Sequence, residues 1–360
     1  MTILHIACIK NDLFSGVPAM VPRMILSEVN VKGNNNIAFY NAKGIKIEGL
    51  EELQVGIGDG LIKNLEPPFN KPDLVVFHEV YYPIFIKLYC ECRMRHIKYL
   101  IVPHGCLTRE AQNIKKFKKR IGNTAAFARF IEHAESLRFL SIHEKKNTVF
   151  KKYGFVCPSG IKLPEKAIVD KRYDRSEDKD CFIRLTYIGR IDPYIKGLDI
   201  LAESINANKN VLRKEKCKIS LYGPLINGNA LERLKKYISD TEIADLLEIK
   251  DPVWGEEKER ILINTDVFVL FSRSEGLPSS VMEALGYGVP CIVSKGTGMA
   301  RIIEQYNAGW TENSIPLENI LVAAVTHRDD AKSKNARKLA EENFDCRISA
   351  RRILRKYQLY

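Results

Sequence analysis

The sequence predicts an α/β protein made of two doubly wound units, each with a parallel sheet, and three observations support this. The chain has 360 residues, and at about 150 residues per domain two domains are expected. In both halves, short β-branched or apolar runs alternate with longer helix-like segments, which is typical of parallel βα units. A highly charged stretch, residues 165–180, separates the halves as a solvated connection would.

The apolar runs place the expected strands in order. In the first half they are Ile3–Cys8, Ile37–Tyr40, Leu74–Phe77, Tyr99–Val102 and Phe139–Ile142. In the second half they are Arg184–Ile188, Lys218–Leu221, Val267–Phe271 and Pro290–Val293. Helices are expected between them, including Gly197–Asn206, Ala230–Ile238 and Glu256–Ile263.

These elements predict an N-terminal Rossmann-like domain over residues 1–165 and a C-terminal one over residues 181–344. Residues 345–360 form a basic helical segment that need not belong to the domain before it, and it can pack back on the N-terminal domain. Two such units create a cleft between the facing carboxyl ends of their strands, where ligands of this architecture bind.

Composition limits the class of protein. With 45% hydrophobic and 28% charged residues, the chain excludes collagen-like, disordered and disulfide-scaffold classes. Its nine cysteines include no Cys-x-x-Cys pair, so they are expected to be reduced core residues of a cytoplasmic protein. No signal peptide is expected at the N-terminus, and no apolar run approaches the about 20 residues that span a bilayer.

The chain is basic, with 56 Lys and Arg against 44 Asp and Glu, which favours polyanions as partners: nucleic acid, anionic lipid or phosphorylated substrates. A cluster in the first half is expected to meet an anionic membrane surface or acceptor, at about 1 kcal/mol per basic residue. The alternative is a solvated helix face. No nucleic-acid-binding signature accompanies the charge, so no nucleic-acid partner is expected. The cluster consists of Lys115, Lys116, Lys118, Lys119 and Arg120.

The most informative stretch, SEGLPSSVMEALGYGVP, follows the expected strand Val267–Phe271. A turn comes first, and a helix begins near Ser279, where free backbone N–H groups form an anion site. Glu275 and Glu283 lie on either side of that helix start, and we expect both to project into one crevice. There they would accept hydrogen bonds from sugar and ribose hydroxyls. Alternatively, they are a turn acid and a solvated helix glutamate.

This stretch resembles the Glu-x7-Glu motif of the retaining glycosyltransferases with the GT-B fold, specifically glycosyltransferase family 4 (group 1). Upstream, residues 187–199 (YIGRIDPYIKGLD) are similar to the family's signature of a strand, Gly-Arg, a spacer and Lys-Gly. The two motifs occur in the family's order. The resemblance implies a GT-B fold, in which two Rossmann-like domains face each other across a cleft that binds a nucleotide-sugar.

The resemblance also implies roles for the charged residues. Arg190 and Lys196 would stabilise the charge that grows on the leaving diphosphate, unless they are simply an exposed loop pair. Glu275 would hold the donor sugar and Glu283 the ribose. The other expected donor-binding residues are Gly16, Gly189, Val253, Gly276, Leu277, Pro278 and Ser279.

In the first half, a Pro-His-Gly segment follows the expected strand Tyr99–Val102. Similar segments in the family place the histidine opposite the donor sugar, and this implies a catalytic role for His104. The alternative is a structural histidine at a helix start, which is also the simpler interpretation of His78. The family's glycine loop is altered here, because Ser15 precedes Gly16 in place of a glycine pair.

We therefore expect a retaining hexosyltransferase that moves a sugar from a nucleotide-sugar, UDP-linked in preference to GDP-linked, to a lipid-linked or oligosaccharide acceptor. The pathway would be cell-surface polysaccharide assembly (O-antigen, other lipopolysaccharide or capsule), at the inner face of the cytoplasmic membrane. No cofactor or metal is expected, because the only Asp-x-Asp, residues 178–180, falls in the charged connection. The alternatives are a sugar-nucleotide epimerase of the same fold and a non-catalytic partner subunit that binds glycan or nucleotide.

Overall fold

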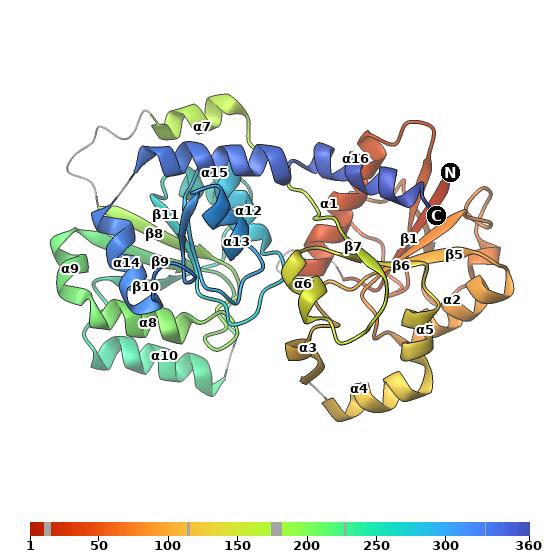
Figure 1. The fold of residues 1–360 in the computed structure, drawn as a ribbon, viewed down its shortest axis with the longest axis horizontal. Coiled ribbons are helices and arrows are strands. Elements are labelled where there is room, and N and C mark those ends of the chain that lie inside the picture. The colour runs from red at the N-terminus through yellow and green to blue at the C-terminus, as the bar shows by residue number, and fades with distance from the viewer. Residues whose placement is uncertain (11–15, 114–115, 174–181, 227, 328) are drawn as a thin grey trace. The chain divides into compact units, whose positions relative to one another are not determined.

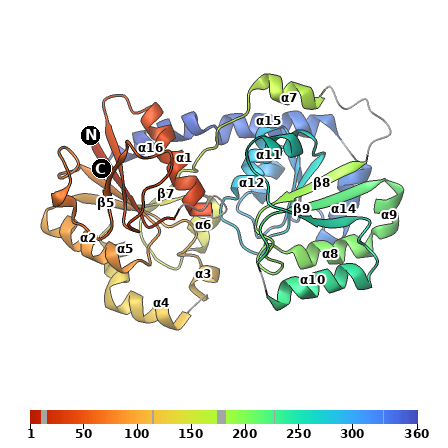
Figure 2. The same cartoon turned by 180° about the vertical axis from the view of Figure 1, so that it is seen from behind.

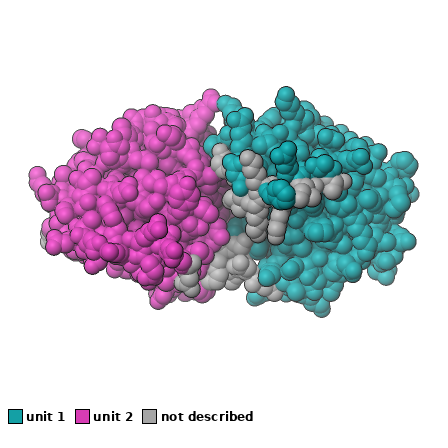
Figure 3. Space-filling view, turned by 90° about the horizontal axis from the view of Figure 1, so that it is seen from below, with its two compact units in different colours: residues 1–160, 346–360 teal, residues 161–345 magenta. Residues whose placement is uncertain are grey.

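The computed structural model describes residues 1–360 except 11–15, 114–115, 174–181, 227 and 328. The chain divides into two compact units, drawn in different colours in Figure 3. Unit 1 comprises residues 1–160 and 346–360, and unit 2 comprises residues 161–345. The charged stretch 165–180 thus falls in unit 2, where Lys166–Tyr173 forms helix α7.

Unit 1 contains a seven-stranded parallel sheet in the order β3-β2-β1-β4-β5-β6-β7 (Figure 1). Its strands are β1 Thr2–Ala7, β2 Asn36–Asn41, β3 Gln54–Ile57, β4 Leu74–His78, β5 Lys98–Val102, β6 Ser136–Phe139 and β7 Gly154–Val156. The central strands β1 and β4 are buried along their whole length, as expected when helices cover both faces of a parallel sheet.

The helices of unit 1 cover this sheet. They are α1 Gly16–Asn30, the 3₁₀ turn η1 Ile62–Asn64, α2 Pro83–Met94, α3 Arg109–Asn113, α4 Lys116–Gly122, the π turn η2 Asn123–Phe127, α5 Ala128–Glu132, α6 Ile142–Asn147 and α16 Cys346–Tyr357. Helices α1 and α16 lie side by side in both views, so the end of the chain completes the unit that the beginning starts (Figures 1 and 2).

Unit 2 contains a six-stranded parallel sheet in the order β10-β9-β8-β11-β12-β13. Its strands are β8 Ile183–Ile188, β9 Cys217–Tyr222, β10 Leu247–Lys250, β11 Val267–Leu270, β12 Cys291–Val293 and β13 Gly309–Thr311. Its helices after α7 are α8 Leu198–Ala207, α9 Lys209–Lys214, α10 Asn229–Asp240, α11 Gly255–Ile263, α12 Ser279–Gly286, α13 Ala300–Gln305, α14 Leu317–Thr326 and α15 Asp330–Asn343. Helix α8 packs with α10 and α14, while α12 packs with α15.

One expected strand is wrong in its position. The strand is Ser136–Phe139, and helix α6 begins at Ile142, where Phe139–Ile142 was expected to be extended. The reason is an N-cap: the Ser141 hydroxyl accepts a hydrogen bond from the Glu144 amide at 3.1 Å, which favours a helix start over a strand. The four strands that the sequence did not predict, β3, β7, β10 and β13, are the edge strands of the two sheets.

Both sheets reverse their strand order at one place, between β1 and β4 in unit 1 and between β8 and β11 in unit 2. At such a switch point the loops after the two strands diverge to opposite faces and leave room for a ligand at the carboxyl edge. Each unit therefore offers one position at which a site is expected, and the candidate residues cluster there.

Candidate active site

At the switch point of unit 2, the loop after β8 meets the loop after β11. The Lys196 ammonium forms an ion pair with the Glu275 carboxylate, and these side chains are only 14% and 24% exposed. Two residues that are far apart in the sequence and were expected in one site are thus in contact. A partly buried ion pair of this kind is screened less by salt than a surface pair.

Glycine makes the approach of these two loops possible. Gly197 has φ +63°, a left-handed conformation, and a Cβ at this position would lie 2.0 Å from the Phe271 carbonyl oxygen. Any other residue would push the two loops apart. The Arg273 amide also donates to the Ile195 carbonyl at 3.1 Å, so the segment that carries Lys196 is held along its backbone.

Arg273, which the sequence did not single out, clamps the same loop. Its guanidinium binds both oxygens of Asp199, at 2.8 and 2.9 Å, which is the bidentate geometry that fixes orientation as well as charge. It also donates to the Tyr194 carbonyl at 2.5 Å and lies over the Tyr194 ring, 4.4 Å from its centroid. The signal was present in the sequence as an arginine two residues before Glu275.

Arg190 is held by its backbone and exposes its side chain. Its carbonyl accepts a hydrogen bond from the Tyr187 hydroxyl at 2.7 Å, and the Gly189 amide before it donates to the Tyr222 carbonyl at 2.9 Å. Gly223 permits this packing, since a Cβ there would lie 1.7 Å from the Gly189 oxygen. Among the described residues, none forms a hydrogen bond or an ion pair with the Arg190 guanidinium.

Helix α12 begins at Ser279, as expected. Its N-cap is Pro278, which offers no side-chain acceptor, so the first N–H groups of the helix have no capping partner within it. The preceding turn, with Gly276 and Leu277 half-buried, is tied to the loop after β12: the Gly298 amide donates to the Glu275 carbonyl at 2.7 Å. This end of α12 is therefore rigidly placed and can receive an anion.

Glu283 points from α12 to α11, where its carboxylate forms an ion pair with the Lys258 ammonium. No sequence motif singled out Lys258, which lies one helical turn into α11 and five residues after Val253. Val253 itself is half-buried just before that helix. Each glutamate of the motif thus has its own lysine, and a common crevice for both carboxylates stays a prediction.

In unit 1, His104 follows β5 in a left-handed conformation with φ +52°, which is uncommon for a residue other than glycine. The Gly105 amide donates to Glu144 Oε1 at 2.5 Å and holds the turn. Nε2 of His104 lies 3.0 Å from Nδ1 of His78, so His78, expected to be merely structural, is its direct partner. Burial, followed by the charge of Arg138, lowers the pKa of His104 to about 3.

The remaining expected residues of unit 1 are less informative. Gly16 begins α1, and a Cβ there would meet nothing within 4 Å. Ser15 lies outside the described residues, as do Lys115 and the side chains of Lys116 and Lys118.

Only two side chains of the basic cluster are described. Arg120 is exposed, whereas Lys119 turns inward: it donates to the Ala111 carbonyl at 2.5 Å and lies 5.1 Å from the centroid of the Tyr81 ring. Two residues before Lys119 in the same helix, Phe117 is 76% exposed. The exposed part of this cluster therefore combines positive charge with an aromatic ring.

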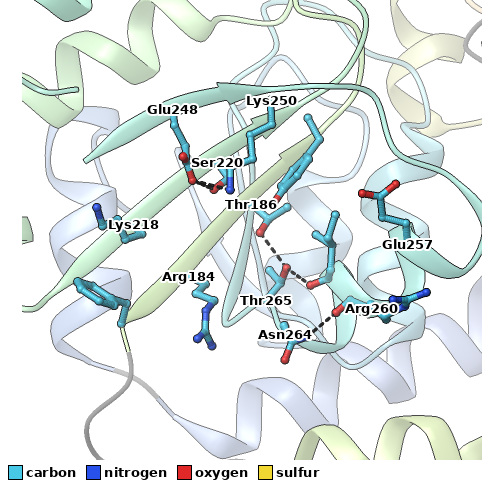
Figure 4. Close-up of a pocket in the computed structure, with 13 residues that line it drawn as sticks. Arg184, Thr186, Lys218, Ser220, Glu248, Lys250, Glu257, Arg260, Asn264 and Thr265 are labelled. Carbon is cyan, nitrogen blue, oxygen red and sulfur yellow. Dashed lines mark hydrogen bonds and ion pairs between the residues drawn. The ribbon is translucent and has the colours of Figure 1, made fainter. Parts of the chain in front are cut away.

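A polar hollow of about 720 Å³ lies elsewhere in unit 2, on the face formed by β8, β9, β10 and α11 (Figure 4). Arg184, Lys218 and Glu248 are among the residues that line it, and no residue expected in the donor site is among them. Within it Glu248 pairs with Lys250 at 2.7 Å, so the charges are partly satisfied by one another.

In the part of the chain that the structure describes, no group of three or more His, Cys, Asp or Glu side chains is arranged to hold a metal ion. A search of the described helices for one long and apolar enough to cross a membrane found none.

Comparison with known proteins agrees with this geometry. Residues 171–315, which contain the unit 2 site, match the family "Glycosyl transferases group 1". A galactosyltransferase of Escherichia coli, named UDP-Gal:alpha-D-GlcNAc-diphosphoundecaprenol alpha-1,3-galactosyltransferase, is 28% identical over 200 residues, which are 53% of this chain and 50% of that protein. The amylovoran biosynthesis glycosyltransferase AmsK of Erwinia amylovora is 32% identical over 23% of this chain and 22% of its own length.

The alignments therefore span half or less of these two relatives. Among solved structures, that of Anabaena Alr3699/HepE in complex with UDP superposes with a TM-score of 0.74 over 100% of both chains, at 13% identity. At that identity the similarity concerns the fold.

Proposed function

We propose that this chain is a group 1 glycosyltransferase with the GT-B fold, and that it transfers a hexose from a nucleotide-sugar to a hydroxyl group with retention of the anomeric configuration. The observation that carries the proposal is the contact between Lys196 and Glu275 at the switch point of unit 2, beside the exposed Arg190. Cations and a carboxylate at one carboxyl edge suit a ligand that carries both phosphate and sugar hydroxyls.

In this proposal the cations stabilise the leaving group. When the bond between the anomeric carbon and the diphosphate breaks, negative charge grows on the diphosphate oxygens. Arg190 can offer two N–H groups to two oxygens, while Lys196 supplies a compact charge. Removal of one such group typically costs about 3–4 kcal/mol of transition-state stabilisation.

Recognition of the donor falls to the rest of the unit 2 site. The sugar would be held by Glu275 and the backbone groups from Gly276 through Leu277 and Pro278 to Ser279. Glu283 would accept hydrogen bonds from the ribose hydroxyls, and the ion pair with the Lys258 ammonium holds that carboxylate in place. The base would lie at Val253. A UDP-linked donor is favoured and a GDP-linked one is the alternative.

The acceptor proton would go to an oxygen of the leaving phosphate on the same face, since no residue is placed as a covalent nucleophile in this proposal. His104 would accept a hydrogen bond from a hydroxyl of the bound sugar. The chemistry proposed here needs no metal, because the fixed cations act on the diphosphate.

The two named relatives support a place in the assembly of bacterial surface polysaccharides, with a lipid-linked or oligosaccharide acceptor. We propose that the protein works at the inner face of the cytoplasmic membrane. The exposed Phe117 and Arg120 support such a peripheral contact.

The test is a panel of UDP- and GDP-sugars, screened first by thermal shift and then for release of nucleotide with and without polyprenyl-diphosphate-linked sugars. A ligand at 100 times its Kd adds about 2.7 kcal/mol of stability, so the correct donor should stand out. Transfer that persists in EDTA and yields a product of unchanged anomeric configuration is expected. Turnover of the donor without any acceptor would favour an epimerase, and nucleotide binding without turnover a non-catalytic subunit.

A further inference from the structure

Unit 1 contains a continuous row of three histidines that ends on a glutamate. Nε2 of His104 lies 3.0 Å from Nδ1 of His78, and Nε2 of His78 lies 3.1 Å from Nδ1 of His5. Nε2 of His5 in turn lies 3.0 Å from Oε2 of Glu28. His5, Glu28 and His78 are completely buried, so water does not interrupt the row.

The topology of the sheet creates this row. β1, β4 and β5 are neighbours in the sheet, and they carry or precede His5, His78 and His104 respectively, while Glu28 reaches in from α1. The rings follow one another with centroids 5.4 and 5.3 Å apart. Residues from four separate parts of the chain thus form one hydrogen-bonded line that crosses the switch point of unit 1 and ends after β5.

A buried arginine next to the row determines its charge. Arg138 donates to Ser159 Oγ at 3.0 Å and to the Tyr357 hydroxyl at 3.1 Å and is fully buried. Burial by itself would lower the pKa of Arg138, but Tyr357, Cys157 and Glu28 together hold it above its ordinary value. Since a guanidinium stays protonated and a buried cation needs a counter-charge, we take the Glu28 carboxylate as the group that balances Arg138.

Hydrogen-bond direction then follows by elimination along the row. An ionised carboxylate can only accept, so His5 must donate from Nε2. A neutral imidazole has one N–H, which leaves His5 Nδ1 as an acceptor for His78 Nε2–H. By the same step His78 Nδ1 accepts from His104 Nε2–H. We propose that Glu28, through His5 and His78, fixes His104 in the Nε2–H tautomer, so that Nδ1 of His104 presents a lone pair to a substrate hydroxyl.

The free end of the row agrees with this assignment. Nδ1 of His104 is buried and has no hydrogen-bond partner among the described residues, which is unusual for a polar atom and marks a position that a ligand can satisfy. Burial lowers the pKa of His78 and of His104, so both rings are neutral at neutral pH and can accept. Glu28, His5 and His78 are positioning residues here. That the hydroxyl belongs to substrate rests on the function proposed above.

If the hydrogen bonds along the row ran in the opposite direction, a different set of tautomers would be expected. If Glu28 were protonated, it would donate to His5, and every ring in the row would reverse to the Nδ1–H form. His104 would then offer a donor instead of an acceptor. The two arrangements differ at all three histidines, so one measurement of tautomers distinguishes them.

The measurement is a long-range ¹H–¹⁵N correlation spectrum of the full chain labelled at its seven histidines. The signals are assigned by single substitutions, and His133, which is exposed and bonded to Tyr89, serves as the internal reference. We expect His5, His78 and His104 to be neutral Nε2–H tautomers from pH 6 to 8. A Nδ1–H form or an imidazolium at His104 would overturn the proposal.

A matched pair of variants tests transmission along the row. In His78→Asn, the amide oxygen can stand near the position of Nδ1 and accept from His104, so a single His104 tautomer and near-normal transfer are expected. In His78→Leu, the side chain at this position can no longer accept a hydrogen bond from His104. We therefore expect mixed His104 tautomers. We also expect kcat to fall about tenfold, which corresponds to the loss of about one hydrogen bond. If His78→Leu retains the pure Nε2–H form of His104, transmission is disproved.

The readouts separate this proposal from the function on which it rests. If the tautomers follow the expectation but His104→Gln leaves transfer unchanged, the row is supported and the assignment of His104 to substrate fails. If His104→Gln abolishes transfer while His104 is found as Nδ1–H, the assignment to substrate stands and the row as proposed is overturned. If His78→Leu does not fold, the wild-type tautomers and those of Glu28→Gln, in which the single direction should be lost, still decide.

Discussion

The switch points of the two units carry titratable residues in different surroundings. In unit 2, Lys196, Glu275 and Arg190 sit on loops after the strands and are partly accessible, so they can meet a charged ligand directly. In unit 1, His5, His78 and Glu28 lie within the elements themselves and are closed off from water. In the function proposed above, the first arrangement supplies charge to a substrate, and in the proposed row the second sets the hydrogen-bond direction of His104.

Only one of the two sites leaves a local pattern in the sequence. The unit 2 residues occur in two continuous stretches, so their spacing can be recognised. The residues of the unit 1 row come from four parts of the chain between His5 and His104. No local sequence pattern therefore indicates the row. His104 was predicted from its Pro-His-Gly segment, but His5 and Glu28 were overlooked and His78 was interpreted as structural.

The largest effect is expected where charge meets the substrate. Lys196→Ala should lower kcat by about 100- to 1000-fold, because it removes stabilisation that grows as the leaving group departs. Steady-state transfer assays with the identified donor measure this. Lys258→Ala is the matched control, since that lysine acts through Glu283 on binding: KM should rise about tenfold with little change in kcat.

If Lys258→Ala instead lowers kcat as strongly as Lys196→Ala, the division of roles between the two lysine–glutamate pairs is wrong. If neither variant affects transfer, the switch point of unit 2 is not the donor site.

The next effect concerns the backbone that brings the unit 2 loops together. Gly197→Ala places a Cβ where the Phe271 carbonyl lies and forces alanine into a left-handed conformation. Strain of this kind costs about 1–3 kcal/mol for the backbone conformation alone, and the steric overlap adds to it. Urea unfolding should therefore show a loss of at least about 2 kcal/mol.

Gly276→Ala is the control for that measurement, since a Cβ there meets nothing within 4 Å and the change should stay within about 0.5 kcal/mol. Equal stability of the two variants would show that the loops after β8 and β11 are not packed as described.

The sequence predicted both sheets through their central strands, because these are buried on both faces and read as continuous apolar runs. The edge strands β3, β7, β10 and β13 were not predicted, since they are short, and β3 and β10 are largely exposed or half-buried. The strand expected at Phe139–Ile142 failed for a local reason, the Ser141 cap. The motifs predicted Lys196 and Glu275 in one site, and the structure shows their side chains in contact. The motifs could not find Lys258, Arg273 or the contact of His78, because these depend on distant elements coming together.

A smaller effect is expected from the buried histidines through pH. The folded-state pKa of His104, about 3, lies below the ordinary value of about 6.5, so the unfolded chain binds more protons between these values. Stability should therefore fall as the pH is lowered from 7 to 5, by up to about 1.4 kcal/mol per pH unit for each such histidine. The raised pKa values of Glu79 and Glu144, which burial causes, act in the opposite sense.

The difference between wild type and His104→Gln isolates the histidine, because the two glutamates are common to both. Urea unfolding at pH 7, 6 and 5 should show a shallower loss in His104→Gln, while His133→Gln, a change at an exposed histidine, should follow wild type. Identical slopes for wild type and His104→Gln would mean that His104 titrates normally and that the row in unit 1 does not keep it neutral.

The smallest effect is expected at the surface of unit 1, where exposed Arg120 lies near the exposed ring of Phe117. Arg120→Gln should weaken binding to vesicles in which about one third of the lipid is anionic. The expected loss of affinity is about fivefold, which corresponds to about 1 kcal/mol per basic residue. Lys236→Gln removes the same charge from an exposed position in unit 2 and should have no effect, so the pair tests whether membrane contact belongs to one unit. Since the attraction is electrostatic, the Arg120 effect should shrink in high salt. Equal losses for both variants would mean that the binding reflects the net charge of +12 and not a surface of unit 1.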